Sequence, residues 1–357
     1  MTQVYLNKIS TAVPPNDVHN TFVAYAPNIL SADRDRKKFR VLTKRAQIEH
    51  RYSVLRPHPE ATQFDADDFY RPGAFPSTRE RMALYKQNAL PLAKQALDQL
   101  GIEALSGKIT HIIVTSCTGF YAPGLDQDII RHYKLNISVE RIIVGFMGCQ
   151  AAVNALKLAY HTVRSEPHAH VLIVNLELCT LHLQDLDDID QIMSFLIFAD
   201  GCATTLVSSD SHTGIEILGF HSSIMQESKE HITWHIGNTG FDMILSRDVP
   251  WTIANGIAQY IDSIPGGYTR DDIVYWAVHP GGSAILDAVE TGLGLSTDAL
   301  ASSREILRNF GNMSSATVMF VLQDILNKKQ TPGLGFALAF GPGLTAEGML
   351  FQKTGAA

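Results

Sequence analysis

The stretch RIIVGFMGCQAAVNALKLAY, residues 141–160, decides the fold because it joins a strand to a helix through a cysteine. Residues 141–146 are largely branched and apolar, which predicts a strand, and Met147 and Gly148 interrupt the pattern. From residue 150 onward, apolar side chains recur at helical spacing. We therefore expect Cys149 at or just before the first helical turn. Free backbone N–H groups and the helix dipole lower the pKa of a thiol there, which favours a nucleophilic thiolate.

Strand and helix patterns alternate along the whole chain, which predicts an α/β fold. The predicted helices cover residues 78–100, 125–133, 150–163, 251–264, 283–293 and 313–326. The predicted strands cover residues 110–116, 141–146, 170–176, 202–208, 215–222, 272–278, 335–340 and 347–351. A polar insertion near residues 184–191 lies between the predicted strands at 170–176 and 202–208. The turn-rich stretch SSDSHTG, residues 208–214, predicts a boundary between two similar halves, residues 1–210 and 211–357.

Two further polar residues occupy junctions like that of Cys149. His279 follows a buried-looking strand in IVYWAVHPGGSAILDAV, and Asn312 precedes an apolar helix in LRNFGNMSSATVMFVLQDIL. Proline and glycine after His279 end the strand and let the backbone approach a ligand. The alternatives are an unreactive buried cysteine, a hydrogen-bonded core histidine and an asparagine that caps its helix.

Together the three residue types suit acyl-transfer chemistry. Cys149 takes an acyl group as a thioester, while a neutral His279 and the Asn312 amide both donate hydrogen bonds to a carbonyl oxygen. Such donors stabilise an oxyanion or an enolate without carrying charge. A protease-like Cys–His–Asn set is the competing interpretation, but the sequence around Cys149 lacks the papain and caspase signatures.

Composition narrows the class of protein. The chain has 357 residues, of which 45% are hydrophobic and 18% charged, and its net charge of -7 argues against nucleic-acid binding. We find no signal peptide and no apolar run near the roughly 20 residues of a membrane span. Four cysteines without a C-x-x-C pair indicate a reducing, cytoplasmic setting, and fourteen histidines show no metal-ligand spacing.

Five motifs carry a family resemblance that covers essentially the whole chain. They are VTSCTGFYAPGLD (residues 114–126), GFMGCQAA (145–152), WAVHPGG (276–282), NFGNMSSA (309–316) and AFGPGLTAEGM (339–349). With these the chain resembles the type III polyketide synthases, the chalcone synthase-like enzymes of the thiolase superfamily. Ketoacyl synthases of fatty-acid initiation share the Cys–His–Asn arrangement but not these strings.

The resemblance implies a five-layer αβαβα fold, a homodimer, and no metal or redox cofactor, with CoA thioesters as substrates. Cys149 would be the nucleophile that takes an acyl thioester. His279 and Asn312 would steady the enolate formed when malonyl-CoA is decarboxylated. The enolate attacks the bound acyl group, extension repeats, and the polyketide cyclises.

The family's other site positions carry over residue by residue. Phe198 falls on one of two gatekeeper phenylalanines between the CoA tunnel and the cavity, and the second position is Met243, a more adaptable side chain. Ser314 matches a cavity serine. The family's GFGPG loop begins with alanine here and continues as Phe340, Gly341, Pro342 and Gly343.

A basic helix near residues 33–52 matches the family's CoA-binding segment. Lys38 and Arg45 fall on positions that bind CoA phosphates, and Val41 replaces a third basic residue. The alternative is an ordinary solvated face. An acyl carrier protein, instead of CoA, is a second possible donor of the starter.

Several pocket positions differ from those of the plant enzymes. Ala122, Thr118 and Cys179 are small or medium-sized, and His182 replaces a threonine. Bacterial synthases of alkylresorcinols and alkylpyrones resemble this pattern, including the string ELCTLHLQ (residues 177–184). We therefore expect a narrow apolar tunnel and a long fatty-acyl starter, in which each buried methylene contributes about 0.8 kcal/mol. Packing substitutions without an open channel are the alternative.

Trp234 stands where many relatives have glycine. Its indole is expected to fill part of the cavity and fold the tetraketide for carbon–carbon closure, which favours a resorcinol over a pyrone. One enzymatic alternative is an alkylpyrone synthase. Others are a small-starter enzyme and a single-condensation ketoacyl-type synthase, and the chain length of the product discriminates these. A catalytically silent acyl-binding scaffold is the alternative from another class, and acyl loading on Cys149 distinguishes it from an enzyme.

Overall fold

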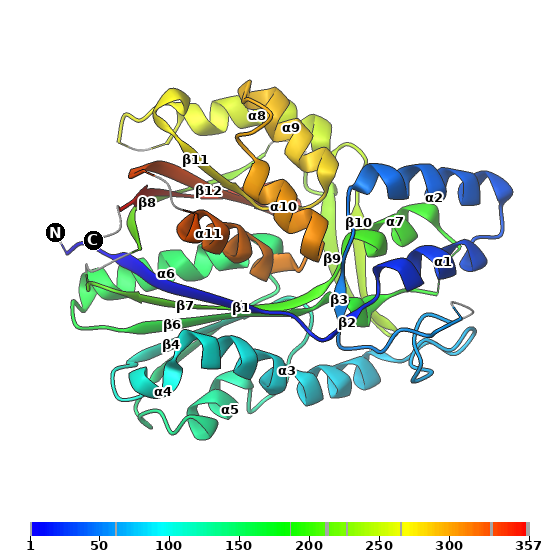
Figure 1. The fold of residues 1–357 in the computed structure, drawn as a ribbon, viewed down its shortest axis with the longest axis horizontal. Coiled ribbons are helices and arrows are strands. Elements are labelled where there is room, and N and C mark those ends of the chain that lie inside the picture. Colours follow the sequence, from blue (N-terminus) through cyan, green and yellow to red (C-terminus); the bar gives the residue numbers. More distant parts are fainter. Residues whose placement is uncertain are drawn as a thin grey trace.

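Two sets of strands, one from each half of the sequence, run through the molecule with helices between and outside them (Figure 1). The structure is a computed structural model that describes residues 2–60, 63–185, 187–210, 214–225, 228–264, 266–328 and 331–354. None of the helices in these ranges is both long and apolar enough to span a bilayer.

The strands of the first half lie in the order β5-β4-β6-β7-β1. Their bounds are β1 (Tyr5–Ala12), β4 (His111–Ser116), β5 (Glu140–Gly145), β6 (Val171–Leu178) and β7 (Asp200–Ser208). β4 runs parallel to β5 and β6, whereas β7 is antiparallel to β6 and β1. Parallel pairing brings the carboxyl ends of β4 and β5 to one edge, beside Cys149.

The second half continues the sheet in the order β8-β13-β12-β11. Its strands are β8 (Ile215–Ile224), β11 (Tyr275–Val278), β12 (Gly333–Gly341) and β13 (Thr345–Lys353). In the part of the sheet that the structure describes, the strands pass from one half to the other where Tyr5 and Leu6 of β1 pair with Glu216 and Ile215 of β8. This short seam makes one nine-stranded sheet of two parts that face each other across a helical layer.

Helices separate and cover the two parts of the sheet (Figure 1). α6 (Ala151–Ser165) and α11 (Thr317–Asn327) lie between them, and α6 packs against β4 and β6 on one side and β13 on the other. Alanines on the buried face of α6 allow this close approach. The outer helices are α3 (Thr78–Leu100), α4 (Ile102–Leu105) and α5 (Leu125–His132) on one face, and α8 (Val249–Asp262) and α9 (Ser283–Leu293) on the other. The predicted five-layer αβαβα fold is confirmed.

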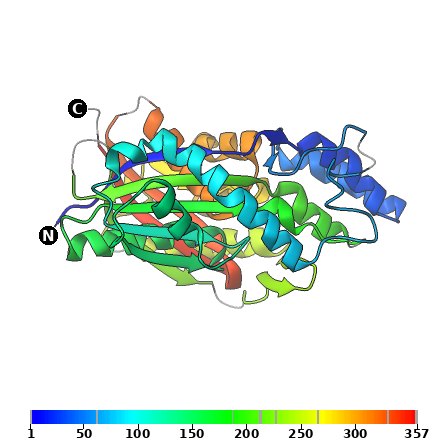
Figure 2. The same cartoon turned by 90° about the horizontal axis from the view of Figure 1, so that it is seen from below.

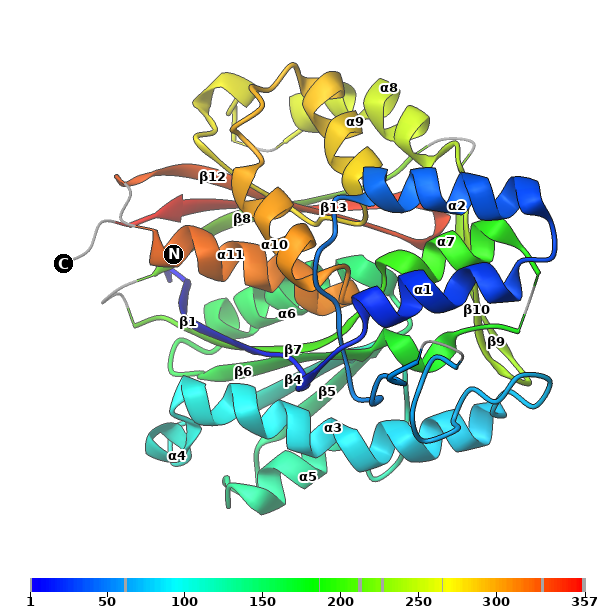
Figure 3. The ribbon, with the colours of Figure 1, turned by 45° about the vertical axis from the view of Figure 1, so that its right-hand side comes forward.

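A group of smaller elements surrounds one end of the sheets (Figure 3). They are β2 (Asn16–Asp17), α1 (His19–Ile29), α2 (Asp33–Ala46), β3 (Tyr52–Ser53), α7 (Ile189–Ile197), β9 (Ile232–Gly237) and β10 (Gly240–Leu245). Helix α10 (Ala301–Phe310) instead packs against α11, α9 and β11. Figure 2 shows α1 and α2 at the opposite end of the molecule from both termini. Short 3-10 turns complete the fold at η1 (Gly148–Gln150), η2 (Cys179–His182), η3 (Arg270–Asp272), η4 (Ser314–Ala316) and η5 (Pro342–Leu344).

Most predicted elements match within a few residues, and the differences have local causes. The helix expected at 313–326 begins at Thr317, since residues 314–316 form η4. The polar insertion expected at 184–191 ends in helix α7, whose first turn is capped by the carboxylate of Asp188. The predicted boundary at 208–214 lies partly outside the described residues, because 211–213 are not among them.

Candidate active site

Cys149 lies in the 3-10 turn between β5 and α6, as the sequence pattern predicts. The preceding Gly148 has a φ of 78°, and a Cβ added there would lie 2.2 Å from Cδ of Pro342. Only glycine fits this left-handed position and this close contact. The motifs GFMGC and FGPG, far apart in sequence, therefore pack directly against each other beside Cys149.

His279 and Asn312 come from the second half. His279 follows β11, and Asn312 lies between α10 and η4. The Asn312 amide oxygen accepts hydrogen bonds from the Ser314 backbone N–H at 2.8 Å, and its Nδ2 donates to the Gly281 carbonyl at 3.3 Å. Asn312 thus caps the local turn while its amide group is held in one orientation.

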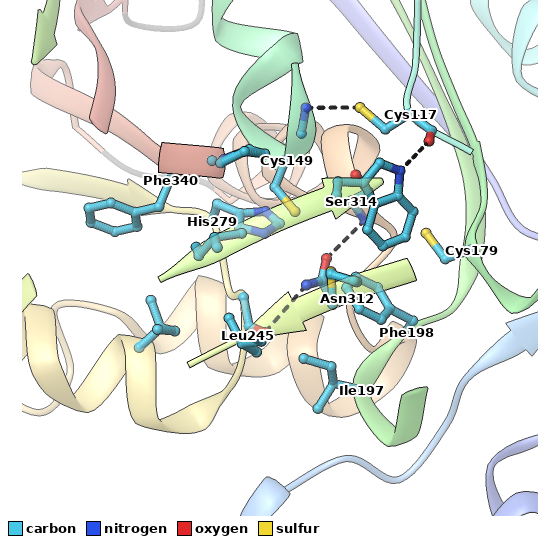
Figure 4. Close-up of a pocket in the computed structure, with 18 of the residues that line it drawn as sticks. Cys117, Cys149, Cys179, Ile197, Phe198, Leu245, His279, Asn312, Ser314 and Phe340 are labelled. Carbon is cyan, nitrogen blue, oxygen red and sulfur yellow. Dashed lines mark hydrogen bonds between the residues drawn. The ribbon is translucent and has the colours of Figure 1, made fainter. Parts of the chain in front are cut away.

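The sulfur, the imidazole and the amide meet at one cavity of about 720 Å³, a volume that includes open solvent at its mouth (Figure 4). The other walls are mostly apolar and come from both halves of the chain: Ile197, Phe198, Ile232, Trp234, Met243, Leu245, Val249, Ile285, Phe340 and Pro342. A thioester in this cavity would touch all three polar groups while the apolar walls exclude water. The predicted constellation is therefore present as one site.

His279 is neutral in this setting. It is buried, and neither ring nitrogen has a hydrogen-bond partner among the described residues. Burial lowers the pKa of His279 to about 3. A buried imidazole whose two nitrogens lack hydrogen-bond partners reduces the stability of the fold. This cost indicates that the nitrogens of His279 form hydrogen bonds with a bound substrate.

The thiol of Cys149 differs from the sequence-based expectation. Burial raises its pKa to about 12, and hydrogen bonds with Ser314 and Asn312, which act in the opposite direction, do not offset this effect. The prediction of a lowered pKa was therefore wrong, because desolvation outweighs the helix end. Burial opposes charge on Cys149 and on His279 separately, so we expect the proton to pass between them as the sulfur attacks.

A buried carboxylate, that of Glu177, holds two segments of the site together. Glu177 on β6 accepts hydrogen bonds from Ser315 Oγ at 2.5 Å, Thr118 Oγ1 at 2.7 Å and the Cys117 backbone N–H at 2.9 Å. Burial raises the pKa of Glu177. Glu177 thereby ties η4 to the loop after β4. Sequence reasoning missed this role, although a lone glutamate in the apolar strand VLIVNLEL was an available signal.

A buried arginine holds the backbone at Phe198 in place. The fully buried Arg51 donates from Nη1 to the carbonyls of Phe198 at 2.6 Å and Phe195 at 3.0 Å. The backbone beside Phe198 is in turn bonded to Asn312, whose carbonyl accepts from Ala199 N–H at 2.9 Å. Arg51 therefore positions the backbone at Phe198 and, through it, the backbone of Asn312.

Comparison with known proteins identifies the family. Residues 3–211 match the profile "Chalcone and stilbene synthases, N-terminal domain", and residues 217–354 match the corresponding C-terminal domain. The chain belongs to the chalcone and stilbene synthase family. It is a type III polyketide synthase, an acyltransferase that condenses malonyl-CoA units iteratively.

Individual relatives cover most of the chain. "Alpha-pyrone synthesis polyketide synthase-like Pks18" of Mycobacterium tuberculosis is 33% identical over 88% of this chain and 80% of its own length. PKS-I from the brown alga Ectocarpus siliculosus has a crystal structure with a TM-score of 0.86 and 29% identity over 99% of both chains. The C-terminal type III domain of Steely1 from Dictyostelium gives a TM-score of 0.89 at 25% identity, again over 99% of both chains.

The structure places most predicted pocket residues of this polyketide synthase around the same cavity. Thr118, Cys179 and Ser314 line it together with Gly341 and the residues named above, whereas Gly343 does not. Trp234 is held by a hydrogen bond from its indole N–H to the Cys117 carbonyl at 2.9 Å. Its ring therefore has a fixed position in the cavity wall.

Two predicted cavity residues lie elsewhere. Ala122 is exposed on the surface, because the loop after β4 turns outward before residue 122, so within this chain it lines no cavity described here. His182 lines a smaller adjoining cavity of about 320 Å³ that shares Cys179, Phe198, Trp234 and Met243 with the main one.

His182 also has a structural role that the sequence did not indicate. Its Nε2 donates to the Thr118 carbonyl at 2.7 Å, and its Nδ1 accepts from the Phe241 N–H at 3.1 Å. The imidazole stacks on the Phe241 ring at 4.3 Å, and burial lowers its pKa to about 3. A neutral His182 thus fastens the β9–β10 hairpin to the loop that carries Thr118.

Lys38 and Arg45 lie at the mouth of a groove that continues into the cavity. The groove encloses about 1580 Å³, including open solvent, and shares Ile197, Leu245, Val249, Gly281 and Ile285 with the cavity. Lys38 lies 3.9 Å from Asp190, which also pairs with Arg247. A basic rim on an apolar channel suits a substrate with a phosphate-bearing head and a thioester tail.

Proposed function

We propose that this enzyme loads a long-chain fatty acyl thioester onto Cys149, extends it with malonyl-CoA and cyclises the product to an alkylresorcinol. The observation that carries the proposal is the apolar cavity at Cys149, in which the small side chains of Thr118 and Cys179 form one wall. Every methylene that enters such a cavity contributes about 0.8 kcal/mol, so a longer chain binds more tightly until the space is filled.

The catalytic roles follow from the chemistry of the three polar groups. Cys149 attacks the acyl carbonyl, its proton passes to His279, and the departing CoA sulfur takes that proton. For decarboxylation, a neutral His279 and the Asn312 amide each offer an N–H to the malonyl thioester oxygen. Neither donor is charged, so the enolate is stabilised without being protonated outright.

Trp234 supports ring closure by carbon–carbon bond formation. Its indole is fixed by the Cys117 carbonyl and packs against Phe198 with ring centres 6.5 Å apart. A rigid wall at this point restricts how a flexible tetraketide folds. The same wall separates the main cavity from the adjoining one.

An alkylpyrone is the second candidate product. The observation that favours it is the 33% identity to Pks18, whose name states alpha-pyrone synthesis. The two products share loading and extension and differ only in the atom that closes the ring. Both outcomes leave the roles of Cys149, His279 and Asn312 unchanged.

We also propose a cytoplasmic homodimer that uses CoA thioesters and needs no metal or redox cofactor. The edge strand β5 supports the dimer, because its Ile142 and Ile143 are exposed together with the nearby Phe120 and Met147. An unprotected apolar edge strand is a usual pairing surface. Met147 lies two residues before the nucleophile, so a partner subunit would brace the active site.

Product analysis tests the proposed function. Purified enzyme is incubated with malonyl-CoA and acyl-CoA starters of increasing length, and the products are identified by mass spectrometry. We expect an alkylresorcinol from palmitoyl-CoA, and no product from Cys149→Ala. Burying a starter shorter than about ten carbons contributes several kcal/mol less binding free energy than burying a palmitoyl chain. Turnover of such short starters alone would contradict the long-chain assignment. Pyrones alone would contradict the ring type.

A further inference from the structure

Helix α2 is strongly basic, whereas the chain as a whole has a negative net charge. Its sequence DRDRKKFRVLTKRA has seven basic and two acidic residues, in a protein whose net charge is -7. The buried Phe39 and Ala46 attach the helix to the core. α2 lies against α7 and α9 at the mouth of the substrate groove (Figure 3).

Arg34 and Arg36 pair with the acidic residues of α2, and the other five basic residues divide between two faces. Lys38, Leu42 and Arg45, spaced four and three residues apart, line the groove itself. Lys37, Arg40, Val41 and Lys44 have the same helical spacing but lie on the adjoining face, and all four are exposed. We call this second set the outer stripe.

The cations of the outer stripe are unpaired within the described part of the chain. Lys37, Arg40 and Lys44 form no ion pair or hydrogen bond with any part of the chain that the structure describes. Val41, in the middle of the stripe, is 52% exposed. Three unpaired cations around an exposed apolar side chain match a partner with acidic groups around an apolar centre.

We propose that the outer stripe docks an acyl carrier protein, which delivers the starter of the proposed function through the neighbouring groove. Carrier proteins are small and acidic, and they hold the acyl group on a phosphopantetheine arm. Lys38 and Arg45 at the rim of the groove then bind the phosphate at the base of that arm. The stripe lies beyond the groove, where it contacts the protein body that a CoA molecule lacks.

The loading step balances without a further reactant. The Cys149 sulfur bonds to the acyl carbonyl carbon, and the bond from that carbon to the phosphopantetheine sulfur breaks. The Cys149 proton, carried by His279, ends on the phosphopantetheine thiol. The products are acyl-enzyme and a free carrier protein.

A membrane surface is the other macromolecular partner that a basic helix suits, and the stripe favours it less. Interfacial helices bury a broad apolar face in the bilayer, whereas this stripe offers only Val41. The stripe also lies beside the groove that leads towards Cys149, where a docked carrier protein would deliver its acyl group.

Loading kinetics test the proposal with charge reversals on the stripe. Wild type, Arg40→Glu and Lys44→Glu are each given palmitoyl carrier protein or palmitoyl-CoA, and the acyl-enzyme is measured by mass spectrometry. We expect each reversal to lower kcat/KM for the carrier protein about tenfold and to leave that for palmitoyl-CoA unchanged. Lys108→Glu, an exposed residue between α4 and β4, is the matched control and should change neither.

Salt gives a second measurement. Raising NaCl from about 50 to 500 mM should slow loading of wild type from the carrier protein more than loading of Arg40→Glu. Equal losses with both donors, or no wild-type loading from carrier protein while palmitoyl-CoA loads, would overturn the docking proposal alone. Failure with palmitoyl-CoA as well would overturn the proposed function. Binding of the stripe to anionic vesicles, lost in Arg40→Glu without a change in carrier loading, would assign it to a membrane instead.

Discussion

The chemistry of single residues at this site depends on burial. Burial raises the pKa of Cys149 to about 12 and lowers that of His279 to about 3, so each group alone resists ionisation near neutral pH. Moving one proton from sulfur to imidazole creates both charges together in one cavity, where each compensates the other. The reactive state is thus a property of the pair.

Removal of the imidazole should expose the raised pKa of the thiol. In His279→Gln we expect the rate of alkylation by iodoacetamide to rise about tenfold per pH unit between pH 6 and 9, because the thiolate fraction grows in that way below the pKa. Wild type should react faster at pH 7 and depend less on pH. A plateau below pH 7 in the variant would show that burial does not control the thiol.

Gly148 provides a steric test beside Cys149. Gly148→Ala should abolish acyl loading and destabilise the fold by about 1–3 kcal/mol, because a Cβ would meet Pro342 and a φ of 78° strains any other residue. Gly343→Ala is the matched control, since Gly343 has a φ of 70° but open space around a Cβ. Urea unfolding and acyl loading of both variants measure the difference. Equal loading by the two would refute the contact argument.

At the scale of elements, Glu177 holds η4 and the loop after β4 on strand β6. Glu177→Ala should cost about 3 kcal/mol of unfolding free energy, because Ser315, Thr118 and the Cys117 N–H all lose a buried acceptor. Glu177→Gln keeps an acceptor oxygen and should cost less. Chemical denaturation of both variants measures this order, and a Gln variant as unstable as the Ala variant would contradict it.

Elements with a strong hydrophobic period could be predicted from sequence, and those held by tertiary contacts could not. The strand and helix on either side of Cys149 and the helix at 283–293 follow their patterns closely. Helix α7 and the β9–β10 hairpin were missed, because polar turn residues precede one, and side-chain latches such as that of His182 hold the other.

The candidate site also has features that the sequence predicts and features that only the fold determines. Motifs and junctions indicated the three residues that the structure brings to one cavity. The direction of the Cys149 pKa shift and the exposed position of Ala122 depend on the folded surroundings. Local sequence reports a helix end but not how much protein surrounds the sulfur, and a turn signal does not report which way its loop leaves the sheet.

At the scale of the whole molecule, the exposed edge strand β5 predicts assembly. Ile143→Lys should convert the proposed dimer to a monomer, because Ile143 is half exposed at the centre of the apolar edge. Light scattering after gel filtration measures the mass. Val274→Lys, which alters an exposed apolar residue just before β11, is the control and should leave the mass unchanged. An unaltered mass in Ile143→Lys would place any subunit contact elsewhere.

The nucleophilic role of Cys149 is the claim on which the whole account depends, and trapping the acyl-enzyme tests it most directly. Wild type and Cys149→Ala are incubated with palmitoyl-CoA alone, and the intact proteins and their peptides are weighed. We predict one palmitoyl group per chain on the peptide that contains Cys149, and none on the variant. Equal acylation of Cys149→Ala, or acylation of Cys117 or Cys179 in wild type, would contradict the account.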